Sequence, residues 1–287
     1  MKRWRAAAVP YLLILPGGLW LVIFFAIPVI VLISLSTQQG NVVDGFTQTF
    51  HFANYANAWD NYHDQFIRSL LYGAIATILC IVLGYPVAYW IAFRGGARKS
   101  TYLFLLLLPF FVSFVLRTVS WQYFLSDNGI LLSPLKSAGI LPQNFRILAT
   151  GTAVVGGLTY NYLPFMVLPI YVALERIDPR LVEAAQDLYA TRAAAFRRVV
   201  LPLSLPGLFA GVLLTFVPVA ADYVNAAILG GTGNTMIGNV IQDEFLNVQD
   251  YPTGAALSFM LMAILLIGMF SYARALGTDE VLEVAAR

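Results

Sequence analysis

Two ionisable residues, Arg117 and Asp222, lie within long apolar stretches of this 287-residue chain. An ionised side chain at the centre of a membrane helix costs roughly 2.5–3.5 kcal/mol, so each needs a physical reason to be there. Arg117 lies 16 residues past Thr101, and Asp222 lies 16 residues past Pro206. On straight helices that rise about 1.5 Å per residue, both would lie about 24 Å into an apolar layer about 30 Å thick. We therefore expect them at one depth.

Two interpretations account for these charges. In the first, Asp222 faces a polar path across the membrane and attracts a cationic solute. The residues assigned to this path are Arg117, Trp121, Tyr160, Asn161, Asp222, Tyr223 and Asn225. In the second, Arg117 and Asp222 form an ion pair that joins two helices, because charges inside membranes commonly pair. Replacing Asp222 with asparagine separates the two, since only the first predicts a loss of solute affinity.

Other chemistry finds little support in the sequence. Cys80 is the single cysteine, and His51 and His63 are too few and too separated to predict a metal site. The glycine-rich stretch 230–235 superficially resembles a phosphate loop, but no Lys-Ser or Lys-Thr follows at the required spacing. No serine, histidine and carboxylate gather at one predicted depth. We therefore expect a non-catalytic chain with no metal or cofactor of its own.

The composition is typical of a membrane protein. Hydrophobic residues make up 59% of the chain and charged residues 11%, with a mean hydropathy of +0.75, whereas soluble domains carry about 25% charged residues. Apolar runs long enough to cross a bilayer predict six helices. Their ranges are 11–35, 67–93, 102–125, 147–174, 203–229 and 255–272. The expected fold class is an all-α membrane protein with six transmembrane helices.

The positive charges indicate an orientation. Of the 17 Lys and Arg residues, thirteen fall in segments that are cytoplasmic if the N-terminus is inside, three fall outside and one is Arg117. Both termini are then cytoplasmic, with an N-terminal segment 1–10, a membrane domain 11–275 and a tail 276–287. A signal peptide is the competing interpretation of the first run, but its length and the lack of a small-residue cleavage pattern favour a retained helix.

Two loops are expected on the outer side. Residues 36–65 are polar and rich in aromatic rings, and they are long enough for a short folded cap. Such rings suit either the membrane interface or a binding surface. Residues 126–146 contain Asn128-Gly129 and two prolines, which predicts turns with one short helix.

A charged, amphipathic segment, residues 176–202, lies between the fourth and fifth runs. Asp178 and Thr191 are suited to cap two short helices, with Pro179 in the first turn of the first. Apolar residues recur at helical spacing on both: Leu181, Ala185 and Leu188 on the first, then Phe196, Val199 and Val200 on the second. Leu201-Pro202 is expected to end the second helix. The pattern fits either a docking arm or a helix pair on the membrane surface.

This segment resembles the EAA loop of the membrane subunits of bacterial binding-protein-dependent ABC importers. The matching residues are Glu183, Ala184, Ala185, Asp187 and Leu188, followed by Leu201-Pro202 and Pro206-Gly207. Tyr189 replaces the family's glycine, and a left-handed backbone there would cost roughly 1–2 kcal/mol. The resemblance implies that an ATPase contacts the arm, with Glu183 and Asp187 in polar contacts and Leu188 and Phe196 in a groove. The residues carried over are Glu183, Ala184, Ala185, Asp187, Leu188, Tyr189 and Phe196.

Further stretches look like the spermidine/putrescine-type, PotB-like permeases. They are residues 108–118, 127–129, 162–166, 229–231 and 236–239. The EAA loop is specific for the importer class, whereas relatives with the remaining pattern also serve other small solutes. The resemblance therefore implies an importer permease, with polyamines as the expected solutes.

The resemblance also implies a type I ABC importer architecture in the bacterial inner membrane. The expected partners are a second, PotC-like permease, two ATPase subunits that bind ATP and Mg, an extracytoplasmic solute-binding protein and membrane lipid, with no nucleic acid. Closure of the ATPase pair would move the helices of residues 183–200 as rigid bodies and reorient the spans. The alternatives are a permease for another small solute, an ion-coupled secondary carrier, which would often show paired internal repeats, and a purely structural membrane subunit or receptor, which would not need the amphipathic arm.

Overall fold

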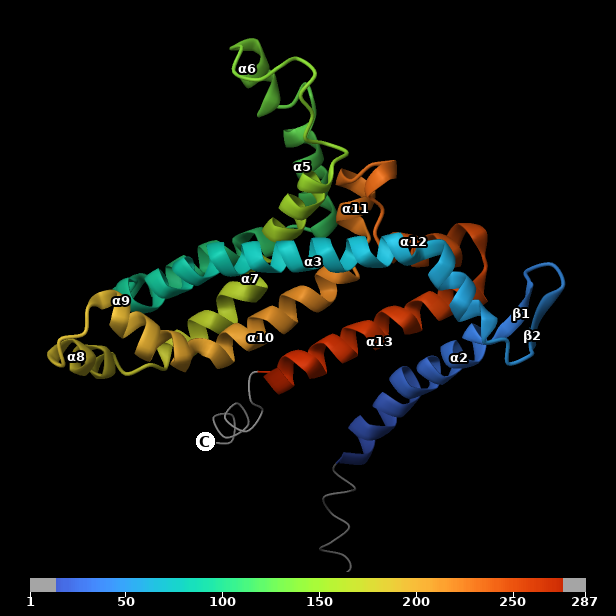
Figure 1. Cartoon of the computed structure of the whole chain (residues 1–287), viewed down its shortest axis with the longest axis horizontal. Coiled ribbons are helices and arrows are strands. Elements are labelled where there is room, and N and C mark those ends of the chain that lie inside the picture. The colour runs from blue at the N-terminus through green and yellow to red at the C-terminus, as the bar shows by residue number, and fades with distance from the viewer. Residues whose placement is uncertain (1–13, 276–287) are drawn as a thin grey trace, which may run out of the picture. The chain divides into compact units, whose positions relative to one another are not determined.

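The computed structural model describes residues 14–275, so the predicted termini 1–10 and 276–287 lie outside the described residues. The chain is mostly helical (Figure 1). A first helix covers Ile14–Ser36 and includes the π turn η1 (Val22–Ala26) and α2 (Ile27–Ser36). The next elements are β1 (Gln38–Asn41), β2 (Gly45–Gln48), α3 (Ala53–Arg94), η2 (Gly96–Arg98), α4 (Lys99–Leu107), η3 (Leu108–Phe111), α5 (Phe114–Leu125), α6 (Leu132–Ser137) and α7 (Gly151–Glu175). The last are α8 (Pro179–Asp187), α9 (Arg192–Ala195), η4 (Phe196–Val200), α10 (Leu201–Ala220), α11 (Val224–Leu229), η5 (Thr232–Asn234), α12 (Ile237–Asp243), η6 (Glu244–Val248) and α13 (Tyr251–Ala275).

Within this described part, five helices are long and apolar enough to cross a membrane, or six if one bent pair counts as a single span. The bent pair corresponds to the predicted third run: residues 96–111 and α5 meet at 87°. Pro109 lacks a backbone N–H, and Val112 and Ser113 are extended, so the helix cannot continue between them. The expectation of a straight helix over 102–125 is therefore wrong, and the depth assigned to Arg117 no longer holds.

The predicted fifth run is also interrupted. α10 ends at Ala220, residues 221–223 form a turn, and α11 begins at Val224. Asp222 lies in this turn rather than inside a helix, and its Oδ1 accepts a hydrogen bond from the N–H of Asn225 at 2.7 Å. The carboxylate thus satisfies a backbone donor at the start of α11, which is the usual role of aspartate at such a position.

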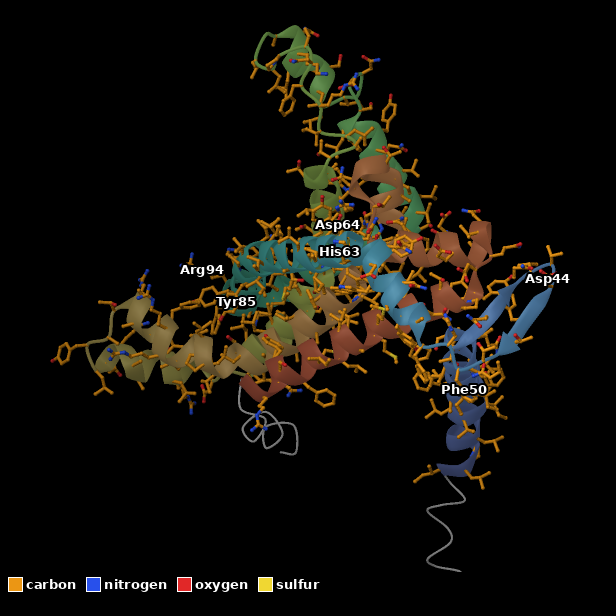
Figure 2. All side chains as sticks on the ribbon, turned by 45° about the vertical axis from the view of Figure 1, so that its right-hand side comes forward. Asp44, Phe50, His63, Asp64, Tyr85 and Arg94 are labelled. Atoms are coloured by element: carbon orange, nitrogen blue, oxygen red, sulfur yellow. The ribbon has the colours of Figure 1, made fainter. Side chains whose placement is uncertain are left out.

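The chain divides into two compact units. The first comprises residues up to 63 together with 241–263, and α3, α12 and α13 contribute residues to both units. In this first unit residues 38–48 of the predicted outer loop form a β-hairpin, which the all-α fold class did not include. The expected loop 36–65 is shorter than predicted, because its residues from 53 onward belong to α3. Gln38 pairs with Gln48 and Asn41 with Gly45. The Asn41 side chain accepts hydrogen bonds from two turn N–H groups, at 2.8 and 2.9 Å, and Asp44 marks the hairpin tip (Figure 2).

Glu244, on η6, is a buried carboxyl group of the first unit. Its Oε1 accepts a hydrogen bond from the Tyr62 hydroxyl at 2.6 Å. Burial raises the pKa of Glu244 above its ordinary value, Asp250 and Asp243 add to the increase, and the bond from Tyr62 opposes it.

This arrangement predicts a pH dependence. Because the folded carboxyl binds its proton more readily than the unfolded one, the free energy of unfolding should fall as pH rises from the ordinary value, 4.5, through the folded pKa. As the pH is lowered from 7 to 5, the wild-type chain should therefore gain thermal stability relative to the Glu244→Gln variant. A difference between the two proteins that is flat over this interval would contradict the prediction.

The second unit, residues 64–240 and the described residues from 264 onward, is built around the contact between α7 and α10. One face of α10 carries small buried residues, Ser204, Gly207, Gly211 and Thr215, at helical spacing. A Cβ built on Gly207 would lie 2.5 Å from the Pro169 carbonyl oxygen of α7, so the two backbones touch there. Small residues let membrane helices approach this closely, and van der Waals packing then holds them together.

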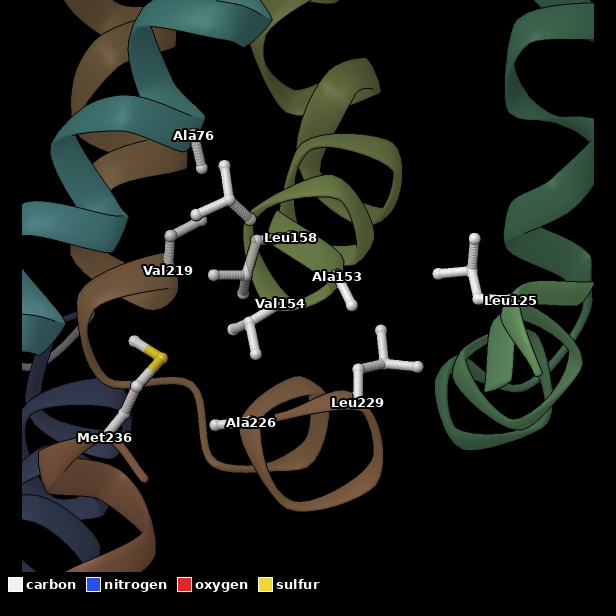
Figure 3. Packing of buried hydrophobic residues seen from close by; sticks show 10 residues of the cluster. Ala76, Leu125, Ala153, Val154, Leu158, Val219, Ala226, Leu229 and Met236 are labelled. Atoms are coloured by element: carbon white, nitrogen blue, oxygen red, sulfur yellow. The ribbon is translucent and has the colours of Figure 1, made fainter. Parts of the chain in front are cut away.

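Buried apolar side chains of the second unit gather around α7. Val154 and Leu158 of α7 pack with Val219 of α10 and with Ala226 and Leu229 of α11 (Figure 3). These five side chains are almost completely buried. The cluster fixes α11, and with it the turn that carries Asp222, against α7.

Candidate functional site

The arm, residues Pro179–Val200, is a helix-turn-helix, as the sequence predicts. It consists of α8, α9 and η4. The Asp178 side chain accepts a hydrogen bond from the N–H of Arg180 at 2.9 Å, and the Thr191 side chain accepts one from the N–H of Ala194 at 3.2 Å. Both predicted helix caps are therefore confirmed.

Tyr189 forms the turn of the arm in a left-handed conformation, with φ of 61°. Its N–H donates to the carbonyl oxygen of Gln186 at 2.9 Å, and the N–H of Ala190 donates to that of Ala185 at 3.1 Å. This pair of bonds is the Schellman helix ending, which usually places glycine at the position of Tyr189. The chain thus makes the turn that a glycine would make, and Tyr189 bears the conformational cost.

Replacing Tyr189 with glycine should stabilise this turn. The tyrosine side chain is 99% exposed, so no packing is lost. Relief of the left-handed conformation is worth up to about 1 kcal/mol after the greater entropy of unfolded glycine is subtracted. Hydrogen exchange at the amides of residues 188–190 should slow about fivefold. Ala190→Gly is the matched control, because Ala190 has no positive φ and glycine there should not slow exchange.

The arm presents one exposed apolar tip. Leu188 is 82% exposed and lies next to the exposed ring of Tyr189, while Leu181 is half exposed. Three other predicted contact residues of α8 are also exposed, namely Glu183, Ala184 and Asp187, whereas Ala185 is half-buried. The apolar surface of the tip is therefore not covered by the rest of the second unit.

Phe196 lies elsewhere than the resemblance implies. Its ring packs edge-on against Tyr85 and Tyr89 of α3, with ring centroids 5.7 and 5.8 Å apart (Tyr85 is labelled in Figure 2). The ring is half-buried, and these contacts engage it within this chain. Phe196 instead joins the arm to α3, and the Tyr85 hydroxyl adds a 2.7 Å hydrogen bond to Ser204 of α10.

The predicted end of the second arm helix at Leu201-Pro202 is wrong. The helix continues without interruption over Arg192–Ala220. Pro202 lacks an N–H and its ring crowds the carbonyl four residues earlier. The chain accommodates this with the π turn η4, in which the N–H of Leu201 donates to the carbonyl oxygen of Phe196, five residues back. The arm and the membrane helix α10 are therefore one continuous element.

Asp222 belongs to a buried network of polar side chains. Its Oδ2 accepts hydrogen bonds from Tyr162 and from the Asn225 side chain, both at 3.2 Å. The Asn225 Oδ1 accepts from the Asn161 amide at 3.1 Å and from Thr118 at 3.5 Å. The network joins α5, α7 and α11. Tyr162 and Thr118 were absent from the predicted site, although each directly follows a predicted residue.

The predicted ion pair between Arg117 and Asp222 does not form. Asp222 is 6% exposed and its hydrogen bonds come from the network. The Arg117 guanidinium lies over the rings of Phe110 and Phe114, 4.5 and 5.7 Å from their centroids. Both residues are in the described part of the chain, and no salt bridge within 4.0 Å joins them. A straight-helix prediction omits the bend before α5, and with it the packing of Arg117 on Phe110 and Phe114.

The predicted path residues thus separate into two groups. Arg117, Trp121 and Tyr160 line a pocket of about 530 Å³ between residues 109–131 and α7. Asn161, Asn225 and Asp222 form the buried network behind it. Tyr223 belongs to neither group, and its side chain is 45% exposed.

The loop 126–146 folds around Asp127 and contains the predicted short helix, α6. Asp127 accepts a hydrogen bond from Lys136 at 2.9 Å and pairs with Arg146 at 3.1 Å. The bond from Lys136 lowers the pKa of Asp127, with Arg146 contributing. These residues border a polar pocket of about 490 Å³. The loop is thus an ordered surface with excess positive charge around one carboxylate.

Known proteins resemble this chain in sequence and in fold. Residues 7–275 match the family described as "Binding-protein-dependent transport system inner membrane component". The chain is 37% identical over 257 residues to the spermidine/putrescine transport system permease protein PotB of Escherichia coli (strain K12), covering 89% of this chain and 94% of that protein. The PotB of Haemophilus influenzae is 39% identical over 259 residues, covering 89% of this chain and 90% of its own.

Solved structures support the fold. A bacterial ABC transporter that imports the acidic polysaccharide alginate contains a chain with a TM-score of 0.71 at 18% identity, covering 96% of this chain and 98% of that one. The MetNI methionine ABC transporter contains one with a TM-score of 0.56 at 19% identity, covering 74% and 94%. The family match and the likeness to PotB, together with the membrane helices, describe a multi-pass inner-membrane transport protein. The chain therefore belongs to the family of binding-protein-dependent transport system inner membrane components.

Proposed function

We propose that this chain is a permease subunit of an ATP-driven importer for polyamines such as spermidine and putrescine. The observation that carries this proposal is the identity of 37% and 39% to two PotB permeases over 89% of the chain. The proposed partners are a second, PotC-like permease, two ATPase subunits and an extracytoplasmic binding protein, with lipid around the spans. ATP and Mg bind to the ATPase subunits.

The arm supplies a mechanical link for such an importer. Leu188 and Tyr189 form the exposed apolar tip that docks into an ATPase, with Glu183 and Asp187 in polar contacts beside it. Because the arm continues into α10 and packs on α3 through Phe196, movement of the tip is passed to two membrane helices. Rigid helices that move together suit the reorientation of spans between inward- and outward-facing states.

Asp222 takes a structural role in this proposal. Its carboxylate is buried and receives hydrogen bonds from Tyr162 and Asn225, which leaves it little capacity to bind an ammonium group. We assign the network to holding α11 in place. Tyr223, beside it, is exposed, and an aromatic ring can bind a cation through its face. Of the predicted path residues, Tyr223 is our candidate for contact with the solute.

A second candidate is the import of another small solute by the same mechanism. The sulfate transport system permease protein CysT of Salmonella typhimurium is 29% identical over 206 residues, covering 71% of this chain and 72% of that protein. Its lower identity and coverage favour the polyamine assignment.

Uptake by the complete complex in proteoliposomes tests the proposal. We expect ATP-dependent, vanadate-sensitive accumulation of labelled spermidine when the binding protein is present. Sulfate uptake in the same vesicles would favour the second candidate. Uptake driven by a proton gradient without ATPase subunits would contradict the importer and favour a secondary carrier.

A further inference from the structure

We propose that the pocket beside Arg117 receives an acidic side chain from the second permease subunit. The Arg117 guanidinium would then pair with that carboxylate in the assembled importer. This inference rests on the proposed function in two respects: it takes the second permease from it, and it uses the positive charge of the solute to identify the occupant.

Among residues 14–275, Arg117 has no salt-bridge partner within 4.0 Å. The residue is 8% exposed, and its Nε and Nη1 have no hydrogen-bond partner in the part of the chain that the structure describes. The rings of Phe110 and Phe114 contact the cation through their faces. They cannot accept the in-plane N–H bonds that a carboxylate accepts in a two-pronged fashion. A buried charge left in this condition is costly unless another molecule completes it.

Asp222, the carboxylate that the sequence suggested as a partner for Arg117, is already engaged. Asp222 accepts hydrogen bonds from Tyr162 and Asn225. Salt bridges within residues 14–275 include Lys99 with Glu175 and Asp127 with Lys136 and Arg146, whereas the Nε and Nη1 atoms of Arg117 have no partner there. The described residues thus leave Arg117 without an anion, and the proposal assigns that anion to the second permease.

The pocket has the composition of a protein interface. Arg117, Trp121 and Tyr160 line it together, and Trp, Tyr and Arg are the residue types enriched at the centres of interfaces. Exposed apolar side chains of the pocket wall surround them: Val112, Phe124 and Leu131 are 45–48% exposed. Its volume of about 530 Å³ is large enough for an acidic side chain and its flanking residues.

The charge of the pocket selects among occupants. A polyamine is a cation and would be repelled by Arg117. A lipid tail cannot accept hydrogen bonds, so it would leave the guanidinium unsatisfied. A subunit embedded beside this one can supply both an apolar surface and a carboxylate. The binding protein and a lipid phosphate are the competing sources, and the experiment below separates them.

Photocrosslinking in the complete complex identifies the occupant. Ser120 borders the pocket and is exposed, so it can be replaced with the photoreactive amino acid p-benzoylphenylalanine. We expect the main crosslinked peptide to come from the second permease and to contain an aspartate or glutamate near the attachment point. A main product with lipid, with the binding protein or with this chain alone would overturn the inference, as would the absence of any product from an assembled complex.

The Arg117→Met variant gives a second test. Recovery of the second permease should fall if the partner supplies a carboxylate, and should stay the same or rise if Arg117 is unpaired in the complex. If the partner supplies a carboxylate, methionine leaves that carboxylate buried and unpaired, and recovery of the second permease with this chain should fall about tenfold or more. If Arg117 stays unpaired in the complex, removing its charge should leave recovery unchanged or improve it, which would overturn the inference. Arg117→Lys should retain part of the recovery.

Two controls complete the design. Arg146→Met removes an arginine that is 75% exposed, and it should leave recovery near that of wild type. In complexes that carry Arg117→Met, replacing the crosslinked acidic residue of the second permease with leucine should restore the recovery of that permease with this chain. Failure of that restoration would overturn the inference. Spermidine uptake by the wild-type complex is measured separately. A failure of the polyamine proposal would appear in that uptake, whereas a failure of the Arg117 proposal would appear in the crosslinking and in the recovery of the second permease.

Discussion

Replacing Gly207 with leucine is expected to separate α10 from α7 and to abolish assembly of the importer. A Cβ at this position would meet the Ala173 Cβ at a distance too short for contact and the Pro169 carbonyl oxygen at 2.5 Å. The second of these is backbone, which cannot rotate away. Overpacking typically costs about 1–3 kcal/mol, and a branched side chain against backbone should reach or exceed the upper value. The thermal midpoint and the yield of purified complex should both fall sharply.

Gly156→Leu is the matched control for this prediction. Gly156 also lies in a membrane helix, α7, but a Cβ there meets nothing within 4 Å and the residue is exposed. The control should therefore retain the wild-type midpoint and yield. Equal losses in the two variants would show that leucine in a membrane helix is harmful in general, and would contradict a special role for the contact at Gly207.

Replacing Asn225 with leucine should have the second largest effect. Asn225 is fully buried and gives hydrogen bonds to Asp222 and receives them from Asn161 and Thr118. Leucine leaves the Asp222 carboxylate and the Asn161 amide each short of a partner. Both groups keep other partners, but a hydrogen bond to a charged group contributes about 1.5–3 kcal/mol and one between neutral groups about 0.5–1.5 kcal/mol, so losing both should cost about 2–4 kcal/mol. Thermal denaturation of the purified complex measures this loss.

Asn144→Leu is the control, because Asn144 is an exposed residue of the loop 126–146. It should leave the thermal midpoint within about 0.5 kcal/mol of wild type. If the Asn225 variant matched this control in stability yet lost affinity for spermidine, the network would contact the solute rather than hold α11. That result would contradict the structural role assigned to Asp222.

The parts of the fold that follow from local chemistry were predicted from the sequence. Asp178 and Thr191 cap helices because their side chains can reach N–H groups two or three residues ahead, and this depends on adjacent residues alone. The left-handed turn at Tyr189 could be anticipated from the position of the family's glycine. The sequence left open whether Tyr189 adopts that conformation, because the cost is small enough for surrounding structure to impose it.

The parts that depend on long-range geometry were not predicted. Apolar runs specify length but not direction, so the bend between Phe111 and Phe114 and the turn before Val224 were missed. Arg117 and Asp222 lie beside these interruptions, and the ion pair between them, one of the two interpretations of the sequence, does not form. Phe196 was assigned to a partner because its spacing marks an apolar face. Spacing cannot tell whether that face meets another subunit or, as here, Tyr85 and Tyr89 of the same chain.

The central claim is that the tip of the arm docks into an ATPase and moves with it. Tyr189→Cys places a thiol at the most exposed point of the tip, and the single natural cysteine, Cys80, is buried and does not compete. In the purified complex, a short bifunctional thiol reagent should join this cysteine to an ATPase subunit, and the yield should change when ATP is bound. A cysteine at Asn144 should give no such product. An intact complex in which the Tyr189→Cys tip never crosslinks to an ATPase subunit, with or without ATP, would contradict the account.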